Sequence, residues 1–274
     1  MTYFARTWLV RVALAVSVAW IGLVVRAGAD HWQGKKFPDI STNFIVGYGS
    51  LVNSASRDST AGAPTPAIPV RVLGLFGYIR SWNHQSPPGS PAGFTALGLR
   101  KQKPEESGVT INGVLYEAKG ADMTKFDQRE AGYVRVEVPI SQVEAVGWQR
   151  LPQTGHLWIY VTGNSDAEAV QGVADENLRE PDAAHPLLQS YIDVVVEGGL
   201  EYGSDFAREL LDTTVGWSRF WLNDRELARR PWVHDPKAAA VDKVMMSTRA
   251  SAEFLASRAF PEMYGERPRS DAAK

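Results

Sequence analysis

The chain has 274 residues, enough to bury a sizeable core, and its composition is ordinary for a globular protein, with 44% hydrophobic and 22% charged residues. Its 29 basic and 31 acidic residues give a net charge of −2, so the totals indicate no nucleic-acid partner. The absence of cysteine excludes disulfides, thiolate metal sites and a cysteine nucleophile. No two of the five histidines stand three or four residues apart, so we expect no sequence-local zinc site.

The first thirty residues have the pattern of an export signal. Two arginines precede an apolar run over residues 12–25, which fits the h-region of a secretory signal better than the ~20 residues of a membrane span. An A-x-A cleavage site follows at residues 27–29. We therefore expect residues 1–29 to be a signal peptide and the protein to be exported, periplasmic or secreted. The alternative is an uncleaved anchor, and a membrane partner is expected only in that case.

The rest of the chain divides by composition. Residues 30–42 are polar, carry glycine and proline, and are typical of a linker. Residues 43–262 have the strand and helix patterns of one domain, which becomes helical from about residue 187. Residues 263–274 are polar, and we expect a frayed tail.

Short apolar and alternating runs predict six strands in the first part of this domain. They lie at residues 43–47, 70–82, 94–101, 109–118, 133–140 and 156–162, with helical turns at 50–60 and a short helix at 122–130. Gly74 and Gly77 interrupt the second strand, as at a bulge or a barrel corner. In the fifth strand apolar residues alternate with Arg135 and Glu137, which predicts that these two side chains share the face opposite the apolar residues.

After residue 186 the pattern changes to helices. They are expected at residues 187–200, 205–212, 218–228 and 237–256. Strands followed by helices are the order of an α+β fold. Six strands with internal glycines also predict a small mixed β-barrel flanked by helices.

The first strand ends abruptly in Gly47-Tyr48-Gly49-Ser50. A dinucleotide fingerprint would need a small residue at position 52, which is valine, and a G-x-S-x-G nucleophile elbow is not matched. Two other interpretations remain open. The segment is a strand-to-helix turn that needs glycine, or it is a nest whose converging backbone N–H groups bind an anionic group.

A second candidate feature is the predicted helix at residues 122–130. Asp127 and Glu130 are three residues apart and share one face of it. A carboxylate at a helix C-terminus meets unfavourable dipole charge, and partial burial raises its pKa further, which suits a general acid or base. The alternative is a surface glutamate that pairs with Arg129 or Arg135.

Taken together, these features resemble the γ-glutamylcyclotransferase superfamily over about residues 43–140. The resemblance rests on the order of "YGSL", "GVLYE" and a D-x-x-E helix leading into "YVRVEV", with 80 residues between Ser50 and Glu130. "YIDVVVEGGLEYG" at residues 191–203 is similar to the C-terminal part of some members, and "GYIRSW" is similar to the glutathione-specific branch.

The resemblance implies a small mixed barrel flanked by helices, and cleavage of γ-glutamyl amides to 5-oxoproline and a free amine without metal or cofactor. By family pattern Glu130 is the catalytic acid/base, and Asp127 is its rival. The implied substrate-binding residues are Tyr48, Gly49, Ser50, Leu51 and Tyr191. The implied partner is a small γ-glutamyl molecule and no nucleic acid.

Two other functions remain open at this point. One is a non-catalytic module that binds a γ-glutamyl-type ligand, and the other is a hydrolase that uses Ser50. An export signal is unexpected in cytoplasmic thiol metabolism, so it favours γ-glutamyl peptides or amines other than glutathione.

The N-terminal pattern generates a first prediction. In protein purified from its native host, the mature chain should begin near Asp30, because the A-x-A site directly precedes it. Intact-mass measurement tests this, and a mass that retains residues 1–29 would establish the anchor instead.

Overall fold

A computed structural model describes residues 42–86, 93–120, 122–162 and 179–259. The chain divides into two units, Met1–Asp39 and Ile40–Lys274, and all described residues belong to the second. The predicted signal peptide at 1–29, almost all of the linker at 30–42 and the tail at 263–274 lie outside the described residues. Within the described residues, no helix has the length and apolarity needed to cross a membrane.

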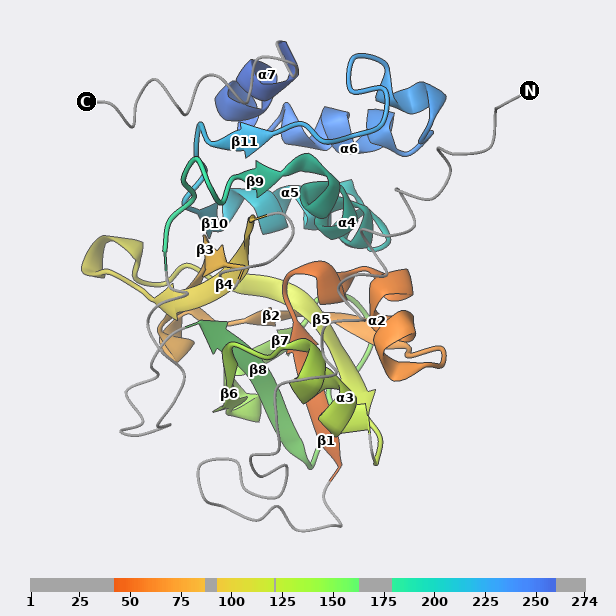
Figure 1. The fold of residues 1–274 in the computed structure, drawn as a ribbon. Helices are drawn as coiled ribbons and strands as arrows, with labels where there is room; N and C mark the ends of the chain where they lie inside the picture. The colour runs from red at the N-terminus through yellow and green to blue at the C-terminus, as the bar shows by residue number, and fades with distance from the viewer. Residues whose placement is uncertain (1–41, 87–92, 121, 163–178, 260–274) are drawn as a thin grey trace. The chain divides into compact units, whose positions relative to one another are not determined.

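A six-stranded mixed sheet forms the centre of the described fold (Figure 1). In spatial order its strands are β6 (Tyr133–Val138), β8 (His156–Thr162), β1 (Asn43–Gly47), β5 (Ile111–Ala118), β2 (Ala67–Val72) and β7 (Val143–Ala145). Strand β1 is parallel to β8 and antiparallel to β5. Its end is fully covered because both neighbours and the helices pack around it. Closure of these strands into a barrel stays a prediction.

Two smaller sheets accompany the central one. The first has the order β10 (Thr214–Val215), β3 (Tyr78–Gln85), β4 (Thr95–Lys101), and the second pairs β11 (Trp221–Leu222) with β9 (Leu187–Leu188). All residues of β3 are buried. The α+β class predicted from the sequence is confirmed.

The prediction of one long strand over residues 70–82 is wrong. A 3₁₀ turn, η3 (Gly74–Phe76), separates β2 from β3, and these strands belong to different sheets. Gly77 has φ 78°, the left-handed conformation that favours glycine, and a side chain at Gly74 would collide with the backbone of Gly108. The two glycines therefore make a turn, not a bulge.

The helices follow the predicted order with two corrections. They are η2 (Ser50–Val52), α2 (Ser54–Ala61), α3 (Asp122–Arg129), α4 (Gln189–Leu200), α5 (Ser204–Asp212), α6 (Ala238–Met245) and α7 (Ser251–Ala259). The helix predicted at 218–228 is wrong, because Trp221 pairs with Leu187 in β11–β9 instead. The helix predicted at 237–256 is two helices, since the hydroxyls of Ser247 and Thr248 bond back to carbonyls at the end of α6.

Helix α4 packs closely against the start of α2. A side chain at Gly198 would lie 2.4 Å from the backbone N of Asn53, and one at Gly199 would lie 3.0 Å from Cα of Ala207 in α5. The two glycines thus let α4 approach both η2 and α5 at backbone distance. The C-terminal helices are thereby fixed against the loop that follows β1.

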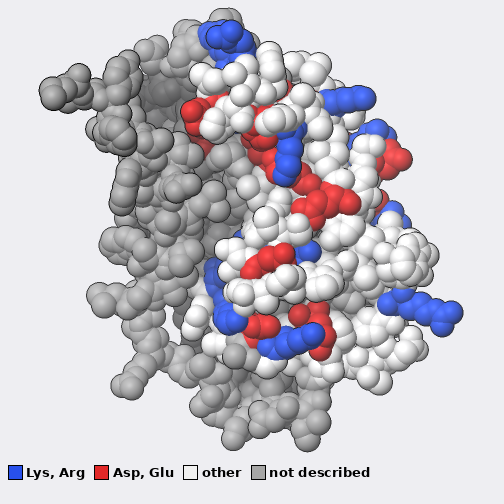
Figure 2. Space-filling view, turned by 90° about the vertical axis from the view of Figure 1, so that its right-hand side faces the viewer, with Lys and Arg blue, Asp and Glu red and all other residues white. Residues whose placement is uncertain are grey.

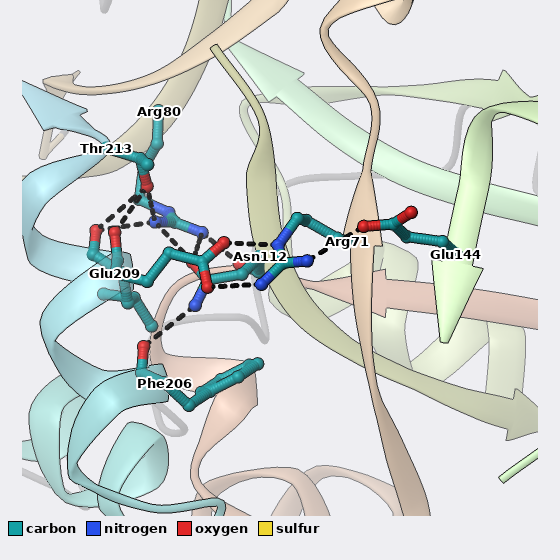
Figure 3. A network of polar contacts seen from close by, with 8 residues as sticks. Arg71, Arg80, Asn112, Glu144, Phe206, Glu209 and Thr213 are labelled. Carbon is teal, nitrogen blue, oxygen red and sulfur yellow. Dashed lines mark hydrogen bonds and ion pairs between the residues drawn. The ribbon is translucent and has the colours of Figure 1, made fainter. Parts of the chain in front are cut away.

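A buried arginine joins the sheets to α5 (Figure 3). Arg80 of β3 is fully buried and donates to Leu210 O at 2.7 Å, to Thr213 Oγ1 at 3.2 Å, and to the backbone and side-chain oxygens of Asn112. Burial lowers its pKa to about 9, so the group stays charged at neutral pH. Carbonyls at the end of α5, and not a carboxylate at contact distance, stabilise this charge.

Charged side chains of both signs are interspersed on the face drawn in Figure 2, and neither sign gathers into one large patch there.

Beside Arg80, Arg71 pairs with Glu209 at 2.5 and 2.7 Å and with Glu144 at 2.9 Å (Figure 3). Its side chain is 31% exposed, so this ion pair is far better solvated than Arg80.

The difference in solvation between Arg80 and Arg71 generates a prediction about stability. Arg80→Met should lower the free energy of unfolding by about 2–5 kcal/mol, because it leaves buried carbonyl and amide oxygens without donors. Arg71→Met is the matched control and should cost at most about 1 kcal/mol, as solvated ion pairs do. Denaturant unfolding of both variants checks this, and equal losses would contradict the distinction.

Candidate active site

The loop after β1 needs glycine for space. A side chain at Gly47 would lie 2.9 Å from Cβ of Leu51, and one at Gly49 would lie 3.3 Å from the Tyr191 hydroxyl. Gly49 has φ −116°, outside the left-handed region, so close packing and not positive φ accounts for the residue. Among the described residues, no acceptor pairs with the backbone N–H of Gly49 or Ser50. These two donors remain free for a ligand.

A buried arginine holds the far side of this loop. Arg57 of α2 is 2% exposed, and its Nη1 donates to Leu51 O at 3.0 Å and to Val52 O at 3.1 Å. Its guanidinium lies over the Tyr116 ring, 5.5 Å from the centroid. Sequence reasoning missed Arg57, because nothing in a polar helix indicates that one arginine turns inward.

Glu130 follows α3 and lies inside the protein. Its side chain is 15% exposed, and its Oε1 lies 3.2 Å from Nε of Arg129. Burial raises the pKa of Glu130, and the charge of Arg129 only partly opposes this effect. The carboxyl is therefore poised for proton transfer closer to neutral pH than an ordinary glutamate.

The negative charge of Glu130 acts on tyrosine hydroxyls from several elements. Four of them belong to Tyr48, Tyr116, Tyr133 and Tyr191, which come from the loop, β5, β6 and α4. Burial raises the pKa of each hydroxyl, and the negative charge of Glu130 raises each further. All four stay protonated at neutral pH, so they can donate hydrogen bonds.

Arg129 connects Glu130 to the loop. Its Nη2 donates to Ser50 Oγ at 3.0 Å and to Ser56 Oγ at 2.8 Å. Its Nη1 donates to Ser56 O at 2.9 Å and to Thr60 Oγ1. The two motifs singled out in the sequence are thus brought together by one guanidinium. Sequence reasoning treated Arg129 only as a surface partner of Glu130.

Tyr191 also contacts the loop, as the resemblance implied. Its hydroxyl lies 3.3 Å from the position that a side chain at Gly49 would occupy. Its ring lies 5.9 Å from Trp82 and 5.8 Å from Phe94, between centroids. Tyr48, Gly49, Ser50, Glu130 and Tyr191 therefore belong to one cluster.

Asp127 has different partners from Glu130, although Asp127 lies in α3 and Glu130 directly follows that helix. Arg135 Nη1 donates to both carboxylate oxygens at 2.8 Å, and the Tyr160 hydroxyl donates to Oδ1 at 2.8 Å. Arg135 is 4% exposed, and its partner Asp127 comes from α3. The Asp127 carboxylate is thus committed to a structural ion pair.

No described histidine hydrogen-bonds Ser50, whose Oγ instead accepts from a cation. Within the described ranges, no three His, Asp or Glu side chains cluster as a metal site.

The burial of Glu130 generates a prediction about stability. A carboxyl whose folded pKa is raised above the ordinary 4.5 destabilises the fold increasingly as pH rises from that value to the folded pKa. Glu130→Gln should therefore raise the melting temperature at pH 7, and the gain should shrink toward pH 4.

Glu106 is the matched control with the opposite sign. Arg100 lowers the pKa of Glu106 to about 2, through hydrogen bonds of 2.7 Å to each carboxylate oxygen. Its stabilisation is present above the ordinary pKa and is lost as pH falls toward 2. Glu106→Gln should thus destabilise the protein at pH 7 by about 1–3 kcal/mol. Thermal melts of both variants across pH test the pair, and shifts of the same sign at pH 7 would contradict it.

Comparison with known proteins returns three similar solved structures of note. A gamma-glutamyl cyclotransferase is 12% identical over 62% of this chain and 86% of its own, with a TM-score of 0.41. The uncharacterized protein loc79017 from Homo sapiens is 12% identical over 61% and 86%, with a TM-score of 0.40. YkqA from Bacillus subtilis is 16% identical over 64% and 56%, with a TM-score of 0.39.

No family model and no curated protein sequence matches the chain. Because the three likenesses are limited in extent, the roles of residues below rest on the contacts within this chain.

Proposed function

We propose that this protein is a γ-glutamylcyclotransferase-type enzyme, which releases 5-oxoproline and a free amine from a γ-glutamyl peptide or amine. One observation carries the proposal: the Glu130 carboxyl, which is 15% exposed, lies next to a glycine loop, and Arg129 joins the two. Among the described residues, two N–H donors of this loop have no acceptor. This arrangement offers a proton acceptor beside an anion-binding loop. The export signal supports a site of action outside the cytoplasm as part of the same proposal.

The nucleophile in this reaction is the substrate's own α-amine. Glu130 takes a proton from the α-ammonium, and the freed amine attacks the γ-carbonyl to close a five-membered ring. The amide C–N bond then breaks as Glu130 returns this proton to the departing nitrogen. The ring nitrogen still carries a second proton of the former ammonium, which Glu130 takes and passes to the free amine, so the enzyme ends unchanged. No serine or cysteine nucleophile is needed. The protein's task is to hold the chain in the attack geometry, where the effective molarity is large.

The glycine loop supplies the polar donors. The N–H groups of Gly49 and Ser50 can bind the substrate's α-carboxylate, or the oxyanion that develops on the γ-carbonyl. The Tyr191 hydroxyl lies over Gly49 and limits the space beside the loop. Tyr48 and Leu51 belong to the loop, and their buried side chains anchor it in the core. This fits the substrate-binding role that the resemblance implies for this segment.

The environment of Ser50 does not favour the hydrolase alternative. A nucleophilic serine needs a base that accepts its proton. Ser50 Oγ instead accepts a hydrogen bond from the guanidinium of Arg129, which has no free acceptor atom. A binding module without turnover remains as an outcome of the experiment.

The central experiment compares two carboxyls of the same segment. Glu130→Gln keeps the shape of the side chain but cannot accept the ammonium proton, so 5-oxoproline release should fall by about 10²–10⁴-fold or more. Asp127→Asn is the matched control and should keep most of the activity, because Asp127 is bound by Arg135 and Tyr160. A panel of γ-glutamyl peptides and amines should be assayed for 5-oxoproline and for glutamate.

The outcomes separate the candidate functions. Glutamate without 5-oxoproline indicates a hydrolase, and ligand binding without either product indicates a binding module. If Asp127→Asn is inactive while Glu130→Gln turns over normally, the assignment of the base is wrong.

A further inference from the structure

Strand β3 contains an irregularity next to the candidate site. Its pairing with β4 shifts between Trp82 and His84, so Asn83 is an extra residue without a partner in the register. Such bulges re-aim a side chain and are common beside active sites. Asn83 is 4% exposed, and neither Oδ1 nor Nδ2 of its carboxamide has a hydrogen-bond partner.

Two more unpartnered polar side chains lie beside Asn83. Thr162, at the end of β8, is 5% exposed, and its Oγ1 has no partner. A side chain at Gly98 of β4 would collide with both Thr162 Oγ1 and Asn83 Oδ1, so these oxygens meet over the same glycine. His84 is 7% exposed, and its Nδ1 is also unpartnered. We call Asn83, His84 and Thr162 the neutral polar cluster.

The cluster adjoins Glu130 through Tyr133. The His84 ring stacks on the Tyr133 ring, with centroids 3.9 Å apart and planes 24° apart. Thr162 is directly opposite Tyr133 in the β6–β8 register. The Tyr133 hydroxyl donates to Leu97 O at 2.8 Å, and the charge of Glu130 acts on it. Tyr133 therefore connects this cluster to the surroundings of Glu130.

Four buried polar atoms without partners are unusual in one place. Folded proteins pair nearly all such atoms, and an unpaired one destabilises the fold. A ligand that supplies both donors and acceptors would satisfy them. The cluster has no formal charge at neutral pH, since burial lowers the pKa of His84 to about 4. A neutral amide group, with one N–H donor and one carbonyl acceptor, has matching chemistry.

We propose that the neutral polar cluster binds an amide group of the substrate's leaving amine, so that the protein prefers γ-glutamyl peptides and amino-acid amides over γ-glutamyl alkylamines. The proposal rests on the proposed function, which it makes more specific. Asn83 and Thr162 bind the amide, and His84 contributes its Nδ1 while its ring fixes Tyr133.

The first experiment measures binding without turnover. N-acetylglycine amide contains peptide groups but no free α-amine, so it cannot cyclise. Titration calorimetry of the full chain should show binding, and Thr162→Val and Asn83→Leu should each weaken it by about 3–10-fold, the effect of one neutral hydrogen bond. Both variants should melt at the wild-type temperature or higher, because each removes unpaired buried atoms.

Thr248→Val is the matched control. Thr248 is 7% exposed, and its hydroxyl donates to Met245 O at 2.8 Å in a part of the fold outside the cluster. This variant should melt lower than wild type and bind the probe unchanged. If Thr162→Val and Asn83→Leu lower the melting temperature but bind the probe as tightly as wild type, the cluster is a structural feature and the proposal is overturned. Undetectable binding to wild type would do the same.

The second experiment compares γ-glutamylglycine amide with γ-glutamylpropylamine. Thr162→Val and Asn83→Leu should raise KM about 3–10-fold for the first and leave KM for the second unchanged. Equal effects on both substrates would overturn the subsite while leaving the proposed function intact. If neither compound is turned over but probe binding follows the prediction, the cyclotransferase function fails and the subsite stands.

Discussion

The guanidinium of Arg129 contacts Glu130 through Nε, Ser50 and Ser56 through Nη2, and Ser56 and Thr60 through Nη1. Because all of its nitrogens are engaged, it fixes three segments relative to one another: the loop after β1, helix α2 and the end of α3. It also opposes the desolvation of Glu130, which would otherwise strongly favour the neutral carboxyl. The candidate site depends on this one cation, since among the described residues it is the group that hydrogen-bonds both the carboxyl and the loop.

Asp127 and Glu130 show that local environment, and not sequence spacing, decides what a carboxyl can do. Burial raises the pKa of both groups. Asp127, however, accepts hydrogen bonds from Arg135 on both carboxylate oxygens and one from the Tyr160 hydroxyl, so its lone pairs are occupied. Glu130 has a single cation on one oxygen and faces hydroxyls that respond to its charge. Such a pair of unlike environments is the usual basis for assigning acid–base roles.

Local patterns in the sequence were sufficient for β1, the glycine loop and α3, because apolar periodicity and glycine spacing act over a few residues. The place of Tyr191 beside the loop was expected only from the family resemblance. The local patterns failed at residues 70–82, where Gly77 ends a turn between two sheets, and at 218–228, where pairing with β9 overrides helix propensity. Arg57, the bridging role of Arg129 and the unpaired atoms around Gly98 were beyond reach, since each depends on contacts between segments far apart in the chain.

The close contact of Gly198 with the backbone of Asn53 has a consequence for how the molecule opens. Rotation of a side chain cannot separate α4 from the residues after the glycine loop at this point, because the contact is between backbone atoms. Opening of the glycine loop therefore requires displacement of α4, which is also wedged against α5 at Gly199. The amide protons of Val52 and Asn53, which are hydrogen-bonded to Gly49 O and Ser50 O, should then exchange with solvent only when the C-terminal helices detach, so residues far apart in sequence form one cooperative exchange unit.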